Sequence, residues 1–159
     1  MENRTLCIPV KGEKILLGIK KRGFGEGKLN GFGGHVEEGE SIEEATVREL
    51  YEEVGLKTNI SSIKKVGEIQ FGCKYVNDDN YNIIMHIFLV NNWENSPKES
   101  EEMGFEWFNK KEIPFDKMWD DDKHWLLLVL EGKRIKAKFS FKKDGETIET
   151  IDIKELGIK

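Results

Sequence analysis

The stretch from 34 to 56, GHVEEGESIEEATVRELYEEVGL, constrains this chain most, because it joins a complete helix signal to a high density of carboxylates. Ser41 followed by Glu44 has the spacing of a capping box, which predicts a helix that begins near Ile42. Gly55 follows the last apolar position and suits a helix C-terminus. We therefore expect one amphipathic helix here, with its ends fixed by local signals.

Three acids of this helix, Glu49, Glu52 and Glu53, are spaced i, i+3 and i+4, so their side chains meet on one face. Like charges at this spacing repel by a few tenths of a kcal/mol per pair. A bound cation explains why they are kept together, and hard oxygen ligands suit Mg²⁺. A solvated acidic face is the alternative. It accounts for neither the adjacent Arg48 nor the Gly33-Gly34 turn upstream.

The same stretch resembles the Nudix box, G-x5-E-x7-R-E-U-x-E-E-x-G-U, in which U is a bulky apolar residue. All nine fixed positions are filled within 23 residues, by Gly34, Glu40, Arg48, Glu49, Leu50, Glu52, Glu53, Gly55 and Leu56. The resemblance implies an α/β fold, an α/β/α sandwich with a mixed β-sheet between helices. It also implies hydrolysis of a nucleoside diphosphate linked to another group, with Mg²⁺ or Mn²⁺ as cofactor.

Length, charge, cysteine spacing and apolar runs limit the domain organisation, the substrate and the compartment that we expect. The chain has 159 residues, which favours one domain spanning 1–159. Its net charge of −5 argues against a nucleic-acid partner held by bulk electrostatics, so we expect a small-molecule nucleotide substrate. Cys7 and Cys73 fit no metal or redox spacing and are expected to be reduced thiols. No apolar run is long enough to span a membrane, so we expect a cytoplasmic protein. We expect a monomer, and an oligomer stays open.

Apolar periodicity predicts the other elements. Two strands at 5–10 and 15–19 should form a hairpin around a turn at 11–14, with Pro9 indicating an edge or a bulge. His86 falls in the most apolar run and is expected to be a satisfied core residue. Further strands are predicted at 62–71, 81–90 and 104–108, with a turn at 77–80. A helix is predicted at 123–130, and a C-terminal hairpin should pair 134–142 with 147–153.

A basic triplet at 20–22 precedes a glycine-rich loop at 23–34. Glycines allow a backbone to approach a ligand closely and to adopt positive φ. Composition alone favours a solvated turn for the triplet, but its place just before the acidic helix favours contact with phosphates. The acidic group at 99–102 is either a solvated loop or the source of one more carboxylate for the metal.

Four segments carry a closer resemblance: KKRGFGEGKLNGFGGHVEEGESIEE, VGEIQF, ESEEM and IPFDKMWDDDKHW. Together they are similar to the MutT-homologue group of Nudix hydrolases, which act on oxidised purine nucleoside triphosphates. This resemblance implies cleavage between the α- and β-phosphates, with Glu53 or Glu52 activating water and Arg48 holding a box glutamate. It implies metal ligation by the carbonyl of Gly34 and by Glu49, Glu52, Glu53 and Glu102. It implies substrate binding by Thr5, Lys20, Phe24, Asn30, Phe71, Trp119, Asp121 and Asp122.

The implied base pocket is chemically reasonable. The indole of Trp119 can stack on a purine. The adjacent carboxyls of Asp121 and Asp122 can accept hydrogen bonds from the N–H edge of an oxidised guanine, and a protonated one can also donate. Two positions depart from the group. Leu29 replaces a tryptophan, and Asp120 replaces a proline and should add a third charge beside the base readers. Either change should loosen base selectivity.

Three other interpretations stay open at this point. The chain could be a Nudix hydrolase of another class, acting on dinucleoside polyphosphates, ADP-ribose or nucleotide sugars. It could be a catalytically silent nucleotide-binding module, although such modules usually lose box acids. A purely structural acidic helix does not explain the glycine and arginine positions.

Overall fold

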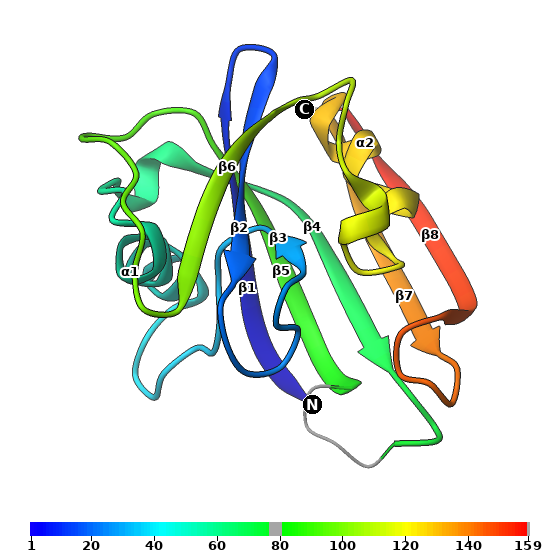
Figure 1. Ribbon diagram of the computed structural model, residues 1–159. Coiled ribbons are helices and arrows are strands. Elements are labelled where there is room, and N and C mark those ends of the chain that lie inside the picture. The colour runs from blue at the N-terminus through cyan, green and yellow to red at the C-terminus, as the bar shows by residue number, and fades with distance from the viewer. Residues whose placement is uncertain (77–80, 159) are drawn as a thin grey trace.

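One mixed sheet separates two helices in the computed structural model, which describes residues 1–76 and 81–158 (Figure 1). The predicted turn at 77–80 lies outside the described residues. The helices are α1 (Ile42–Val54) and α2 (Asp122–Leu130), with short 3₁₀ turns at Ile60–Ser62 and Phe115–Lys117. The strands are β1 (Glu2–Lys11), β2 (Lys14–Lys20), β3 (Leu29–Asn30), β4 (Ile63–Gly72), β5 (Asn82–Val90), β6 (Met103–Asn109), β7 (Lys133–Phe141) and β8 (Ile148–Ile158).

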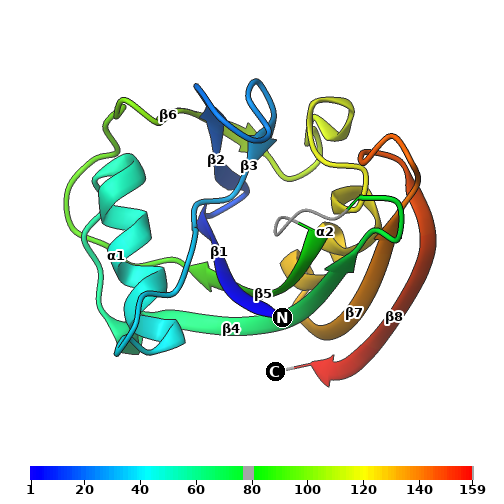
Figure 2. The ribbon, with the colours of Figure 1, turned by 90° about the horizontal axis from the view of Figure 1, so that it is seen from below.

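The sheet runs in the order β3-β2-β1-β5-β4-β7-β8, and β6 adds to β2. The pairs β1–β5 and β4–β7 are parallel, whereas the other pairs are antiparallel. Figure 2 shows α1 and α2 on opposite sides of this sheet. The predicted α/β/α sandwich with a mixed sheet is therefore confirmed.

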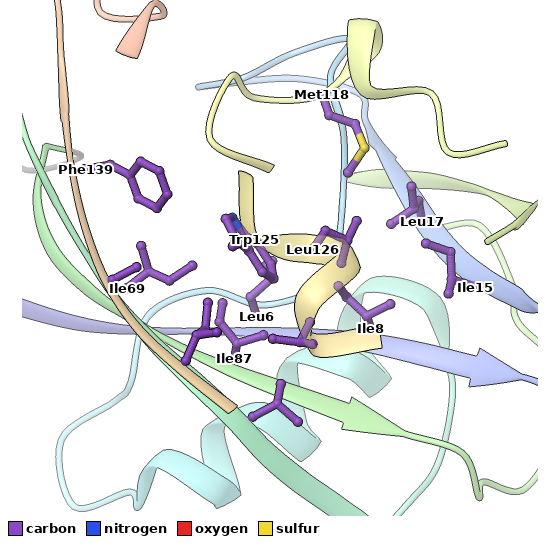
Figure 3. Close-up of a cluster of buried hydrophobic side chains, with 14 of the residues drawn as sticks. Leu6, Ile8, Ile15, Leu17, Ile69, Ile87, Met118, Trp125, Leu126 and Phe139 are labelled. Carbon is purple, nitrogen blue, oxygen red and sulfur yellow. The ribbon is translucent and has the colours of Figure 1, made fainter. Parts of the chain in front are cut away.

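Two hydrophobic cores lie on the two faces of the sheet. On one face, Leu50 and Val54 of α1 pack with Phe32 and Phe88. On the other, side chains of α2 pack against β1, β2, β4, β5 and β7, and Figure 3 shows Trp125, Leu126, Leu6, Ile8, Ile69, Ile87 and Phe139 among them. Each face of the sheet is thus buried by one helix, which fixes the helix positions relative to the strands.

Helix α1 has the ends that its sequence predicts. The Ser41 hydroxyl accepts from the Glu44 N–H at 3.0 Å, and the Glu44 carboxylate accepts from the Ser41 N–H at 2.8 Å. Gly55 ends the helix in the left-handed conformation, with φ 73°. The capping box and the glycine stop therefore fix which turn of the helix carries the three acids.

Strand β1 is interior, so the expectation that Pro9 marks an edge strand is wrong. On one side β1 pairs in parallel with β5, and Pro9 itself is opposite Val90. On its other side β1 meets the segment around Phe32 first and then β2, beginning at Val10. Pro9 lies where β1 changes partner, and a residue without an N–H is tolerated there.

Contacts of β1 with the glycine-rich segment bring that segment to the acidic helix. Cys7 exchanges backbone hydrogen bonds with Phe32, and the Thr5 N–H donates to the Gly34 carbonyl at 2.9 Å. A Cβ atom on Gly33 would lie 1.8 Å from the Thr5 carbonyl oxygen. Only glycine allows the two backbones to approach this closely.

Several smaller predictions can also be compared with the structure. The turn at 11–14 joins an antiparallel β1–β2 pair as expected, α2 begins one residue early, and β8 extends to 158. Cys7 and Cys73 are free thiols. His86 is buried, with Nε2 2.9 Å from Asn3 Oδ1, although its Nδ1 has no hydrogen-bond partner among the described residues.

Neither helix in the described part of the chain is long and apolar enough to cross a membrane.

Candidate active site

A cavity of about 330 Å³ opens between the glycine-rich loop, the start of α2 and the strands β1, β4 and β5. Every residue that the sequence assigns to substrate binding lines it, namely Thr5, Lys20, Phe24, Asn30, Phe71, Trp119, Asp121 and Asp122. Gly33, Gly34 and Glu53 line the same cavity, so the acidic helix and the aromatic residues share one space.

Glu53 is the box acid that faces this cavity. Its side chain is buried, and Oε1 accepts a hydrogen bond from the Gly33 N–H at 2.8 Å. Burial raises the pKa of Glu53 to about 8 against the effect of that hydrogen bond, and the charges of Glu49 and Glu102 add to the rise while Lys20 opposes it. A cation bound here would favour the ionised carboxylate.

Arg48 ties the acids of the box together. Its Nε and Nη2 donate to the two carboxylate oxygens of Glu40 at 2.7 and 2.9 Å, and its Nη1 donates to Glu49 at 2.8 Å and Glu52 at 2.7 Å. The hydrogen bond to Glu40 contributes most to raising the pKa of Arg48. The guanidinium also donates to the His35 carbonyl, so it joins α1 to the preceding loop.

The donor set fits a divalent cation, although no three Asp, Glu, His or Cys side chains within residues 1–76 and 81–158 converge closely enough to enclose one. The carboxylate of Glu49 lies against Gly34, where a Cβ would be 2.9 Å from it. Together with Glu52 and Glu53 it offers the oxygen ligands that Mg²⁺ prefers. The Gly34 carbonyl already accepts from Thr5, which leaves it one lone pair for a metal.

The basic triplet divides between two environments. Lys20 lines the cavity close enough to Glu53 to affect its pKa. Lys21 donates through Nζ to the Ser100 carbonyl at 2.8 Å. Arg22 donates to Glu102 through Nε at 3.0 Å and Nη2 at 2.5 Å, and this hydrogen bond lowers the pKa of Glu102. Only Lys20 of the three therefore lines the cavity.

The opposite end of the cavity is aromatic. Phe24 stacks on Trp119 with ring centroids 5.1 Å apart and an interplanar angle of 21°. Phe141 meets Trp119 edge-on at 6.3 Å, and Tyr81 meets Phe24 edge-on at 5.7 Å. A Cβ on Gly25, which has φ 83°, would lie 3.1 Å from the Trp119 ring, so the loop needs glycine at this contact.

Asp121 and Asp122 are both 3% exposed. Asp121 Oδ2 accepts from the Trp125 Nε1–H at 2.9 Å, so this acid bonds a core indole and makes no side-chain cap on α2. Burial raises the pKa of Asp121 to about 6. Burial, and next the charge of Asp121, raise the pKa of Asp122 well above its usual range. Both carboxyl groups are therefore protonated more readily than an exposed aspartate.

The structure places both departures from the group outside the cavity lining. Asp120 is not among the cavity-lining residues. Its carboxylate pairs with Lys123 at 2.8 Å and accepts from the Ile148 N–H at 2.9 Å, so it joins the start of α2 to β8. Leu29 is a buried core residue that pairs with Ile19. Asp120 does add a charge beside the base readers, because it contributes to raising the pKa of Asp121, but its carboxylate bonds Lys123 and Ile148 and does not line the cavity.

Part of the cavity wall is formed by residues that the sequence did not indicate. Tyr81 and Phe141 close the aromatic end, and Lys28 lines it as well. Phe141 was recognisable as an inward position of the alternating strand 134–142, but nothing local indicates which cavity that face lines. The Tyr81 hydroxyl donates to the Gly145 carbonyl at 2.6 Å, a contact across 64 residues that sequence spacing does not reveal.

This fold and this arrangement of acids define a nucleotide-hydrolase class, and the chain belongs to the NUDIX domain family, which it matches over residues 2–129. It is 41% identical to the oxidized purine nucleoside triphosphate hydrolase of Mus musculus over 96% of this chain and 94% of that protein. It is 45% identical to the protein of the same name from Danio rerio, over 86% of this chain and 85% of that one. Among solved structures, the mutator MutT protein of Bacillus halodurans is 25% identical with a TM-score of 0.75, covering 96% of this chain and 97% of its own.

Proposed function

We propose that this Nudix hydrolase converts oxidised purine nucleoside triphosphates, such as 8-oxo-dGTP, to the nucleoside monophosphate and pyrophosphate. One observation carries the proposal: a single cavity has the box acid Glu53 at one end and Trp119 with Asp121 and Asp122 at the other. The first end suits phosphates with a divalent cation, and the second suits a flat base with hydrogen-bonding edges. The activity named for the mouse and zebrafish relatives agrees with this pairing.

Glu49, Glu52 and Glu53 would hold Mg²⁺ or Mn²⁺, with Glu102 and the Gly34 carbonyl as further ligands. The bound ion supplies charge neutralisation for the phosphates. Glu53 orients the attacking water and accepts its proton, because it is the box acid that lines the cavity. Lys20 reaches the same end of the cavity and offsets phosphate charge.

Arg48 keeps these acids in place rather than contacting substrate. Its charge-assisted bonds run to Glu40 in the loop and to Glu49 and Glu52 in the helix. A guanidinium that bridges both segments limits how far the carboxylates can move, and well-oriented groups are the larger part of phosphoryl-transfer catalysis.

At the base end, a purine stacks on Trp119 and presents its edge to Asp121 and Asp122. A neutral carboxyl donates a hydrogen bond, and an ionised one accepts. The raised pKa values of both acids support a pair that takes up a proton more readily than exposed aspartates, and a pair with one proton can read an edge with both donors and acceptors. Phe24, Phe71, Thr5 and Asn30 complete the walls around the base.

The proposed setting is a cytoplasmic monomer that takes free nucleotides rather than nucleic acid. Two free cysteines are consistent with a reducing compartment. A net charge of −5 does not favour a long polyanion. The whole chain 1–159 is taken as one domain, since β7 and β8 extend the sheet that carries the site.

The direct test is a comparison of kcat/KM for 8-oxo-dGTP, 2-oxo-dATP and dGTP with Mg²⁺, with pyrophosphate as the measured product. We expect both oxidised substrates to exceed dGTP and activity to disappear on chelation of the metal. ADP-ribose and a dinucleoside polyphosphate complete the panel. Faster turnover of either of these would assign the chain to another Nudix class, and no turnover of any would favour a nucleotide-binding module.

A further inference from the structure

Lys28 projects from the end of the glycine-rich loop into the aromatic end of the cavity. Its ammonium lies 4.9 Å from the centroid of the Trp119 ring. The backbone around it is fixed, because the Lys28 N–H donates to the Gly25 carbonyl at 3.0 Å and the Lys28 carbonyl accepts from the Lys20 N–H at 3.2 Å. Its place beside the indole is therefore set by the loop.

The Lys28 ammonium makes only weak contacts within the described part of the chain. Glu146 Oε1 is 4.0 Å away, at the limit of an ion pair, and that glutamate side chain is 65% exposed. Exposed pairs of this kind contribute about 0–1 kcal/mol, and a cation–π contact at a partly exposed site adds about 0.5–1 kcal/mol. A ligand that offers a good acceptor can therefore recruit the ammonium at little cost.

The two buried carboxyl groups at this end offer acceptor oxygens, which an ammonium lacks. Asp122 Oδ2 is buried without a hydrogen-bond partner among the described residues, and Asp121 Oδ2 already accepts from Trp125. Lys28 is near enough to Asp122 to stabilise its ionised form. Acceptors and a strong donor thus face the same base position. A purine edge with both N–H and carbonyl groups needs both kinds.

We propose that Lys28 determines specificity at the base site by donating a hydrogen bond from its ammonium to an exocyclic carbonyl oxygen of the purine stacked on Trp119. This inference rests on the proposed function and deepens it. The two lysines that line the cavity then have different roles. Lys20 lies near Glu53 at the phosphate end, and Lys28 lies beside Trp119 at the base end. The chemical feature recognised is the base carbonyl, which adenine lacks and oxidised purines carry.

The test uses a variant of Lys28 that removes the charge and keeps the approximate length of the side chain. We would measure kcat/KM of Lys28→Met for 8-oxo-dGTP, 2-oxo-dATP and dGTP, which have base carbonyls, and for dATP, which has none. Loss of a charge-assisted hydrogen bond predicts about a tenfold or larger drop for the three carbonyl bases. For dATP we expect a change within about twofold. Lys28→Arg keeps the donor and should retain most of the selectivity.

Lys123→Met is the matched control, because Lys123 pairs with Asp120 outside the cavity lining and should leave the selectivity as it is. An equal drop for all four triphosphates would assign Lys28 to the phosphates or to loop structure and overturn the inference. No drop for any of them would overturn it as well. Lys28→Leu, a second variant without a hydrogen-bond donor, takes the place of Lys28→Met if circular dichroism shows the latter to be misfolded.

A binding measurement separates this inference from the proposed function. If the wild-type protein hydrolyses none of the four triphosphates, the proposed function fails. Calorimetric titration of 8-oxo-dGMP and dAMP into wild type and Lys28→Met still tests the lysine. We expect the variant to lose about tenfold in affinity for 8-oxo-dGMP relative to dAMP, and an unchanged ratio would contradict the role of Lys28.

Discussion

At the scale of single residues, Glu53 and Glu52 differ in environment although both are box acids. Glu53 lines the cavity and is buried, whereas Glu52 is 52% exposed on its side chain and pairs with Arg48. We expect Glu53→Gln to lower kcat by at least about a hundredfold, because general-base catalysis typically contributes that much. Glu52→Gln should lose less. Steady-state kinetics with Mg²⁺ tests this, with circular dichroism to show that both variants fold.

A Glu53→Gln variant with near wild-type kcat would remove Glu53 from the role of base. A larger loss for Glu52→Gln than for Glu53→Gln would transfer that role to the exposed acid. Both variants keep a hydrogen-bonding side chain of the same size, so the comparison isolates the carboxylate charge.

The buried pair of Asp121 and Asp122 makes stability depend on pH. Burial raises the pKa of Asp121 to about 6 and that of Asp122 well above its usual range. Between the unfolded pKa near 4 and these raised values, the folded state binds more protons than the unfolded state, so stability falls as pH rises. The slope approaches about 1.4 kcal/mol per pH unit for each group at pH values between its unfolded and its folded pKa.

Asp122→Asn removes one of these titrations and relieves its neighbour of a charge. We therefore expect the free energy of unfolding of the variant to fall less than that of wild type between pH 5 and pH 8. Urea unfolding at several pH values, without nucleotide or metal, measures the difference. Glu53 titrates in both proteins, so its contribution to the pH dependence cancels when the two are compared. Parallel curves for the two proteins would show that Asp122 does not ionise in this range.

At the scale of elements, the contact between β1 and the glycine-rich segment aligns the site. An added Cβ at Gly33 would lie 1.8 Å from the Thr5 carbonyl oxygen, and backbone cannot yield that far without moving the segment. The Gly33 N–H also donates to Glu53, so a shifted segment loses that bond. We expect Gly33→Ala to lower both kcat and melting temperature.

Gly72→Ala is the matched control for this change. Gly72 lies in β4, and the nearest atom to an added Cβ there is the Tyr81 carbonyl oxygen at 3.9 Å, an ordinary contact. Gly33→Ala should therefore have a clearly lower melting temperature and a clearly lower kcat than Gly72→Ala. If Gly33→Ala behaved like Gly72→Ala, the tight approach of the two backbones would not be needed to position Glu53.

Local signals explain which elements the sequence predicted. The capping box, the Gly55 stop and the i, i+3, i+4 acids are all encoded within 16 residues, and the structure has the helix they indicate. The prediction of an edge strand at Pro9 failed because β1 is interior and changes partner at that point, which depends on residues around Phe32 and Val10. Partner choice in a sheet is a long-range property and leaves little trace in the strand itself.

At the scale of the whole molecule, the site joins segments from most of the chain. The aromatic end uses Phe24, Phe71, Trp119 and Phe141, and the last of these lies beyond the segment 2–129 that matches the family. The resemblance to a known group supplied the residues that line the cavity. It did not supply Tyr81 or Phe141, because their positions depend on how the β7–β8 hairpin folds against α2 and the glycine-rich loop.

Asp120 connects these distant parts and gives the last prediction. Its carboxylate accepts from the Ile148 N–H and pairs with Lys123, and the hydrogen bond with Lys123 is the main cause that lowers its pKa. Asp120→Ala leaves the Ile148 N–H without this acceptor and should lower the free energy of unfolding by about 1–2 kcal/mol. Lys123→Ala breaks only a partly exposed ion pair and should cost less than about 1 kcal/mol.

Because Asp120 is outside the cavity lining, the ratio of kcat/KM for 8-oxo-dGTP and dGTP should stay within about twofold of wild type in Asp120→Ala. Asp122→Asn, which alters a cavity carboxyl, should change that ratio more. The sequence favoured the opposite result, a direct influence of Asp120 on base choice. A selectivity change in Asp120→Ala as large as that in Asp122→Asn would restore that interpretation. It would also mean that the link from α2 to β8 sets the position of the base readers.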